Sequence, residues 1–234
     1  MTYQKITKHL HSLSNQEIAN HSQRFFKTAK GEYGYGDIFL GIRVPVIRQA
    51  VKKYKSTPLK EIKKLLKSEF HEIRLFALIL MVLQYDKANE DEQEEIYSVY
   101  LKNTKYINNW DLVDSSAQYI VGRHIENKDR SILYELAKSN SLWERRIAVI
   151  STFYFIRKND FKDALSISEL LLNDQQDLIH KAVGWMLREV GNRDLIKETA
   201  FLKAHYKTMP RVMLRYSIEK FSKEDRKKYL KGEI

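Results

Sequence analysis

Apolar residues recur with helical spacing along nearly the whole chain. In the segment 178–190 they occupy positions i, i+3, i+4 and i+7, namely Val183, Met186, Leu187 and Val190. This spacing is typical of the buried stripe of an amphipathic helix. The segment 72–85 is apolar on nearly every face, which predicts a helix in the interior. No run alternates apolar and polar residues between turn signals, so no strand is predicted. The pattern therefore predicts an all-α fold.

Local signals place several helix starts. Residues 14–17, Ser-Asn-Gln-Glu, have the form of a capping box, and residues 222–225 are a weaker version. Pro45, Pro58 and Pro210 each fit the first turn of a helix, where a missing N–H costs nothing. These signals agree with helices that follow one another with short connections.

The segment 30–37 stands apart because it holds three of the eight glycines. It predicts a loop between helices. It is not a phosphate-binding P-loop, because no Gly-Lys-Ser/Thr follows. We favour a plain connector here over a mobile flap that carries aromatic side chains to a ligand.

A degenerate repeat links the predicted helices. A cation opens an apolar helical stretch at Arg74, Arg146, Lys181 and Arg215. The steps between them are 72, 35 and 34 positions, and the midpoint of the first is Trp110. A period in the mid-thirties corresponds to two helices with their turns, and such units bury their apolar faces by stacking. We therefore predict a curved α-solenoid of HEAT-like helix pairs. No linker composition divides it, so we expect a single domain over residues 1–234.

The net charge indicates which class of partner the protein binds. The chain has 41 Lys and Arg against 30 Asp and Glu, a net charge of +11. Such a surplus favours a polyanion, although a merely basic surface explains the composition equally well. The absence of Cys excludes disulfides and Cys-based zinc sites. The polar amino terminus shows no signal peptide and no apolar stretch has membrane-spanning length, so we expect a cytoplasmic protein.

The segment 178–190 carries an unusual polar face. At about 100° per residue, Lys181, Trp185 and Arg188 share the side opposite the buried stripe. One interpretation is a surface Trp covered by the stems of Lys and Arg. We favour an aromatic and cationic surface for a nucleic acid, because an exposed Trp needs something to cover it.

A second candidate surface lies in the segment 108–121. Trp110 and Asp114 are one helical turn apart and share a face. Asp114 lies seven positions before Val121, at the edge of the apolar stripe, so its carboxylate should be partly desolvated. A buried hydrogen bond and a catalytic role explain that position equally well. Asp111 belongs to the first helical turn, where the helix dipole favours an anion.

Other chemistry finds no support. The seven histidines show no HExxH or similar metal spacing, and no Ser occupies a Gly-x-Ser-x-Gly turn. We therefore predict no metal and no cofactor. In the segment that begins near Ser141, Arg145 points away from the apolar stripe and Arg146 lies at its edge, so both are predicted to reach solvent or phosphate.

Together these segments resemble the AlkD-type DNA alkylation repair glycosylases, a family with HEAT-like repeats. The resemblance rests on four segments, residues 39–45, 110–114, 142–146 and 181–189. It covers most of the chain in the expected order. The Trp-x-x-x-Asp and Gly-Trp-x-Leu-Arg elements are fairly specific as a pair, and either alone would be weak.

The resemblance implies a monomer with a basic groove that holds duplex DNA containing alkylated purines, associated with the nucleoid when bound. It implies excision of cationic N3- and N7-alkylated purines without flipping the base into a pocket. Asp114 would be the catalytic carboxylate, with Trp110 and Trp185 beside the deoxyribose. The implied DNA contacts are Arg43, Arg146, Lys181 and Arg188.

One departure and two alternatives accompany this expectation. Phe25 stands where the family often has a tyrosine near the DNA, so a hydroxyl contact is lost or is supplied by Tyr33 or Tyr35. The first alternative is a non-catalytic module that binds damaged or branched DNA, since the family includes such members. The second is a HEAT-type scaffold for another protein, which predicts no DNA binding at physiological salt.

Overall fold

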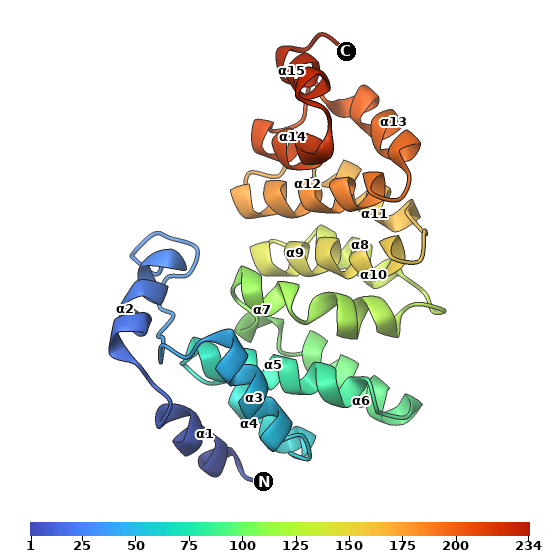
Figure 1. Cartoon of the computed structure of the whole chain (residues 1–234). Coiled ribbons are helices and arrows are strands. Elements are labelled where there is room, and N and C mark those ends of the chain that lie inside the picture. Colours follow the sequence, from blue (N-terminus) through green and yellow to red (C-terminus); the bar gives the residue numbers. More distant parts are fainter. The chain divides into compact units, whose positions relative to one another are not determined.

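The computed structural model describes residues 1–234, and it confirms the all-α prediction (Figure 1). The only β-type pairing is an isolated bridge between Ile38 and Phe70. The chain divides into two compact units, Met1–Ser116 and Ala117–Ile234, and the expectation of one domain stays a prediction beside this division. None of the helices combines the length and the apolar character that crossing a bilayer requires.

The first unit is built around one apolar helix. Its elements are α1 (Tyr3–His11), α2 (Gln16–Phe25), α3 (Val44–Lys53), α4 (Leu59–Leu66), α5 (His71–Tyr85), α6 (Glu90–Leu101), the 3₁₀ turn η1 (Thr104–Tyr106) and α7 (Trp110–Asp114). Helix α5 contacts α3, α4, α6 and α7. Phe76, Ala77 and Leu78 on α5 are fully buried, which confirms the predicted interior helix. Helix α5 therefore positions α7, which carries the first candidate site.

The second unit stacks helices in layers. Its elements are the π-helical turn η2 (Gln118–Gly122), α8 (Ser131–Ala137), α9 (Leu142–Ser151), α10 (Phe153–Ile156), α11 (Lys162–Leu170), α12 (Asp177–Gly191), α13 (Leu195–His205), α14 (Arg211–Ser217), the 3₁₀ turn η3 (Ile218–Lys220) and α15 (Lys223–Lys231). Helix α12 contacts both α9 and α14, and Figure 1 shows the three as successive layers. Helices α8 and α11 each contact the layer that follows them in sequence. The helix pairing agrees with the predicted repeat, and the curved solenoid stays a prediction.

The repeat register is visible in this stack. Arg146, Lys181 and Arg215 are each the fifth residue of their helix, α9, α12 and α14. The cation found by spacing in the sequence therefore marks equivalent positions of stacked helices.

Two glycines show the same period in the packing. A Cβ on Gly122 would lie 2.3 Å from the Ser151 carbonyl oxygen, and a Cβ on Gly184 would lie 2.5 Å from the Met213 carbonyl oxygen. The same added Cβ would also meet the Cβ of a tyrosine, Tyr154 for Gly122 and Tyr216 for Gly184. Each tyrosine follows the contacted carbonyl residue by three positions. The number of residues between the glycine and the contacted carbonyl is the same in both cases. Two successive levels of the stack therefore have the same close backbone contact.

The predicted helix starts are correct to within a residue. Asn15, not Ser14, is the N-cap of α2, and its side chain accepts a hydrogen bond from the Ile18 N–H at 3.0 Å. Ser222 caps α15 as expected, accepting from the Asp225 N–H at 3.0 Å. Pro45 lies in the first turn of α3, whereas Pro58 and Pro210 are the N-cap residues of α4 and α14.

Candidate functional site

Helix α7 presents the first pair of candidate residues. Trp110 begins the helix and Asp114 ends it one turn later, and both side chains are half-buried. The side chain of the fully buried Asn109 caps the helix by accepting from the Trp110 N–H at 2.9 Å. The structure thus brings together the indole and the carboxylate that the sequence placed on one helical face.

The expected relation between Asp114 and Val121 is wrong. It assumed a continuous α-helix, but α7 ends at Asp114, a turn follows at Ser115 and Ser116, and residues 118–122 are π-helical. Asp114 therefore lies at the carboxyl end of a short helix. Its charge is close enough to Tyr100 to help burial raise the pKa of that buried phenol, against a hydrogen bond with Ser116.

Trp110 is one end of a stack of aromatic rings. Its ring stacks on Phe26 with centroids 5.1 Å apart, Phe26 stacks on Phe39 at 5.0 Å, and Phe39 stacks on His71 at 4.6 Å. Phe25 meets the edge of Trp110 at 5.9 Å and is 58% exposed. The stack fixes the plane of the indole and leaves Phe25 uncovered beside it.

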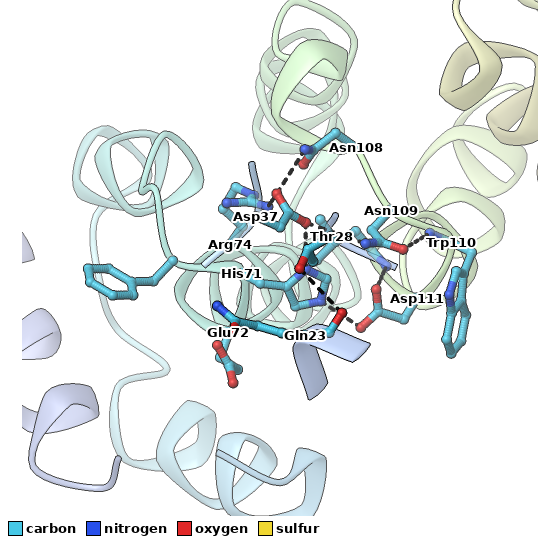
Figure 2. A network of polar contacts seen from close by, with 12 residues as sticks. Gln23, Thr28, Asp37, His71, Glu72, Arg74, Asn108, Asn109, Trp110 and Asp111 are labelled. Atoms are coloured by element: carbon cyan, nitrogen blue, oxygen red, sulfur yellow. Dashed lines mark hydrogen bonds and ion pairs between the residues drawn. The ribbon is translucent and has the colours of Figure 1, made fainter. Parts of the chain in front are cut away.

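His71, the other end of this stack, also belongs to a buried polar network (Figure 2). Its centre is Asp37, which accepts from Arg74 Nη2 at 2.6 Å, from His71 Nδ1 at 3.2 Å and from Asn108 Nδ2 at 3.0 Å. Burial alone would raise the pKa of Asp37, but the His71 hydrogen bond and the Arg74 charge outweigh it and lower the pKa. The carboxylate therefore stays ionised although it is buried.

His71 connects this network to α7. Its Nε2 lies 2.8 Å from Asp111 Oδ2, and the imidazole is almost fully buried. Burial alone would lower the pKa of His71, but the charge and hydrogen bond of Asp111 and the hydrogen bond with Asp37 raise it to about 9. At neutral pH the ring is an imidazolium that donates from both nitrogens. Asp111 thus does more than complement a helix dipole, because it holds the first turn of α7 against α5.

The glycine-rich loop ends at Asp37, which is held by this network. Just after the loop, the carboxylate of Glu72 accepts from the backbone N–H groups of Leu40 and Gly41 at 2.9 and 2.7 Å. Gly34 packs so closely that a Cβ would lie 2.4 Å from the Phe26 carbonyl oxygen. These contacts agree with a connector, and a ligand contact by Tyr33 or by the exposed Tyr35 stays a prediction.

An open cavity of about 850 Å³ adjoins the network within the first unit. Its lining includes Phe26, His71 and Asp111 at the network and the exposed cations Arg24 and Arg43. Arg43 is the N-cap residue of α3. The structure therefore places the predicted Arg43 at an exposed, cation-bearing surface.

The second candidate surface lies on α12 in the second unit. Val183, Met186, Leu187 and Val190 are fully buried, as predicted. Lys181, Trp185 and Arg188 are half-buried on the other side of the helix. The structure thus confirms the two faces of this helix.

Each of these three side chains has an acidic neighbour. Lys181 Nζ lies 2.6 Å from Asp177 Oδ2. Trp185 Nε1 donates to Glu189 Oε1 at 3.3 Å, and Arg188 forms an ion pair with Glu219. The Lys181 and Arg188 ion pairs are partly exposed, so solvent weakens them.

Arg146 does not match its expected exposure. It is 5% exposed, and its Nη1 donates to the Leu178 carbonyl at 2.5 Å, across to the start of α12. The expectation that it lies open to solvent is wrong, because the stack of α9 on α12 encloses its stem. Arg145 is half-buried and bonded to Asp174 Oδ2 at 2.6 Å. A phosphate contact by Arg146 stays a prediction.

Comparison with known proteins identifies the family. The family model of DNA alkylation repair enzymes matches residues 6–221. The chain belongs to this family. A solved structure described as a predicted DNA alkylation repair enzyme from Enterococcus faecalis matches with a TM-score of 0.72 and 18% identity, over 90% of this chain and 97% of that chain. At that identity the likeness shows the fold alone. Among curated proteins, no relative matches the chain.

Family membership assigns the chain to the repair of alkylation damage in DNA. In this member of the DNA alkylation repair family, one unit carries Trp110, Asp114 and Arg43. The other unit carries Lys181, Trp185 and Arg188. No group of three or more His, Cys, Asp or Glu side chains is arranged to hold a metal ion.

Sequence reasoning missed the centre of the first site. Asp37, His71 and Asn108 come from three separate segments, and no short motif connects them. Arg74 was found only as a repeat cation, although it is 4% exposed and paired with Asp37. Two local features of the sequence could have indicated these residues. Asp37 is the charged residue at the end of the glycine-rich loop, and the first turn of the apolar helix α5 contains polar residues.

Proposed function

We propose that the protein is a DNA glycosylase that excises cationic N3- and N7-alkylated purines from duplex DNA. The observation that carries the proposal is the pairing of a half-exposed carboxylate, Asp114, with Trp110 on one turn of α7. Two other carboxylates of this region, Asp37 and Asp111, both bind His71. Asp114 is the carboxylate of this region that shares its helical face with an indole.

The chemistry suits a site of this kind. An N3- or N7-alkylated purine carries a positive charge, so it leaves as a neutral base when the C1′–N bond breaks and its electron pair moves to the ring. No general acid is needed. Positive charge develops on the sugar as an oxocarbenium-like cation, as in glycoside hydrolysis. Water then adds to C1′ and loses a proton.

Each residue has a role in this proposal. Asp114 stabilises the sugar cation and orients the attacking water. The face of Trp110 attracts the same cation and excludes water around it. Trp185 supplies an indole of the same kind from α12. Lys181, Arg188, Arg146 and Arg43 contact phosphates and supply affinity through counterion release. The buried His71 network supports this reading because it fixes the start of α7, and a fixed carboxylate stabilises charge better than a mobile one.

The decisive experiment uses methylated duplex DNA and Asp114→Asn. We expect release of free 7-methylguanine or 3-methyladenine to fall at least about 100-fold, with DNA affinity nearly unchanged. Chromatography of the released bases measures the first quantity and fluorescence anisotropy the second. Asp91→Asn is a matched control, because Asp91 is exposed in the first turn of α6. Undiminished excision by Asp114→Asn would remove the carboxylate from the mechanism.

A second experiment tests the phosphate-binding role of α12. Lys181→Glu with Arg188→Glu should weaken DNA binding and flatten its dependence on salt concentration. An unchanged salt slope would place the DNA elsewhere. If the wild-type protein binds DNA but releases no base from any methylated duplex, the non-catalytic binding module is correct.

A further inference from the structure

A separate cavity of about 520 Å³ lies within the second unit, at the carboxyl end of α12. It is open to solvent and is lined by residues of α12, α13, η3 and α15, which Figure 1 shows at the orange and red end of the chain. Its lining combines Arg188, Glu198, Lys203 and Lys220 with apolar and hydroxyl side chains. This volume is within the range of small-molecule sites.

Glu198 is the unusual residue of this cavity. It is 2% exposed, and its Oε1 has no hydrogen-bond partner. Its Oε2 lies against Gly191, where any Cβ would collide with it, so the chain leaves room for this carboxyl group. Buried polar groups are normally hydrogen-bonded, and an unpartnered one calls for an explanation. Burial raises the pKa of Glu198 to about 8, with the Arg188 charge acting in the opposite direction.

A second buried atom of the same lining is also unpartnered. Arg188 pairs with Glu219 through Nη1, but its Nε–H is buried and has no acceptor. One unpartnered donor and one unpartnered carboxyl group therefore belong to residues that line a single cavity. Water bound at these atoms would leave most of the volume unexplained.

The polar lining favours an oxyanion over a cation. Lys203 and Lys220 are exposed cations at the lining, and Arg188 adds a third positive charge. The side-chain carboxylate of Asp225 also belongs to the lining, and it accepts from the Ser222 hydroxyl at 2.8 Å. A protonated Glu198 is itself a donor. Donors from several elements thus surround one space.

We infer that this cavity binds a phosphate-bearing organic anion of mononucleotide size, with the phosphate at Lys203 and Lys220 and the organic part against Leu195 and Phe221. Glu198 donates to the ligand from the lining of the cavity. The phosphate ester has two sources, a free nucleotide or the 5′-phosphate of a DNA end. The inference does not depend on base excision.

Isothermal titration of the full chain at pH 7 with AMP, inorganic phosphate and adenosine tests the site. We expect AMP to bind, phosphate to bind more weakly and adenosine to bind least. Lys203→Ala with Lys220→Ala should weaken AMP binding by at least about tenfold, as for loss of a charge-assisted hydrogen bond. Lys207→Ala is the matched control, because Lys207 is exposed and lies outside the lining.

Variants of Glu198 test the inference independently of the lysines. Glu198→Leu should weaken AMP binding by about tenfold, whereas Glu198→Gln should retain it, since the amide still donates. The inference is overturned if AMP fails to bind at concentrations up to about 5 mM, if adenosine binds as tightly, or if the lysine pair can be removed without effect. Bound water alone predicts the first of these results.

The two sources are separated with duplex DNA. Affinity is measured for one undamaged duplex with 5′-phosphates and with 5′-hydroxyls, in the presence and absence of AMP. A preference for 5′-phosphates that AMP abolishes assigns the cavity to a DNA end. Equal affinities that AMP leaves unchanged assign it to a free nucleotide. Either result leaves base excision to be judged by the Asp114 variant.

Discussion

Two buried ionisable groups, one in each unit, show opposite solutions to the same problem. His71 is surrounded by partners, with Asp37 on one ring nitrogen and Asp111 on the other. Glu198 has a carboxyl oxygen with no partner. Both pKa values are raised, His71 to about 9 and Glu198 to about 8. In His71 the neighbouring carboxylates stabilise the charged form, whereas in Glu198 burial penalises it.

The difference teaches what each region is suited for. A buried charge that is fully paired holds its neighbours in one arrangement, because moving any partner uncovers a charge. This suits the support of Trp110 and Asp114. A buried acid with an unpartnered oxygen stays neutral and has unused hydrogen-bonding capacity. Such a group is suited to bind a ligand.

The largest expected effect comes from breaking the paired network. Asp37→Ala leaves both Arg74 and His71 buried without their common carboxylate. We expect a loss of about 3–5 kcal/mol in the free energy of unfolding, as for other half-removed buried pairs. Urea denaturation followed by circular dichroism measures it. A loss below about 1 kcal/mol would mean that the network contributes no more than surface pairs do.

The pH dependence of stability sharpens the comparison next. His71 binds its proton more tightly when folded, with a pKa of about 9 against 6.5. Its contribution is therefore complete below pH 6.5 and is lost as pH rises to about 9. The free energy of unfolding of the wild type, relative to that of His71→Gln, should therefore fall by about 3 kcal/mol between these pH values. Denaturant unfolding of both proteins at several pH values measures this difference. A difference that stays constant over this range would contradict the imidazolium.

Glu198→Gln tests whether burial keeps the Glu198 carboxyl group protonated. The unfolded chain releases the Glu198 proton above pH 4.5, whereas the folded chain keeps it until about pH 8. Wild-type stability should therefore fall as pH rises through this window, and the amide should not show that fall. We expect the variant to be more stable by about 1–3 kcal/mol at pH 8 and equal to wild type near pH 4. Thermal unfolding at several pH values measures the difference.

The smallest effect is expected at an exposed pair. Glu219→Gln removes the partner of Arg188 at a position where Glu219 is half exposed. Stability should change by less than about 1 kcal/mol, because solvent screens such pairs. DNA affinity should rise modestly at low salt, since a carboxylate no longer competes with phosphate for Arg188. An unchanged affinity at every salt concentration would separate Arg188 from the DNA surface.

The sequence alone determined the features that depend on spacing. Helical periodicity fixed the all-α class and the buried stripe of α12 that ends with Leu187 and Val190. A period in the mid-thirties located equivalent cations in stacked helices, as Arg146 and Lys181 show. The four-residue interval also placed Trp110 and Asp114 on one turn. These properties follow from backbone geometry, which repeats regularly along the chain.

Only the tertiary structure decided which charges are buried and what they contact. Asp37 meets a histidine 34 positions away and an asparagine 71 positions away, and no periodicity encodes those distances. The break of α7 at Asp114 and the enclosure of Arg146 likewise depend on neighbouring segments. Glu198 has the sequence context of an ordinary helical glutamate, yet it is buried and belongs to the lining of a cavity. Desolvation and pairing are properties of the packed environment, so they emerge only when distant segments come together.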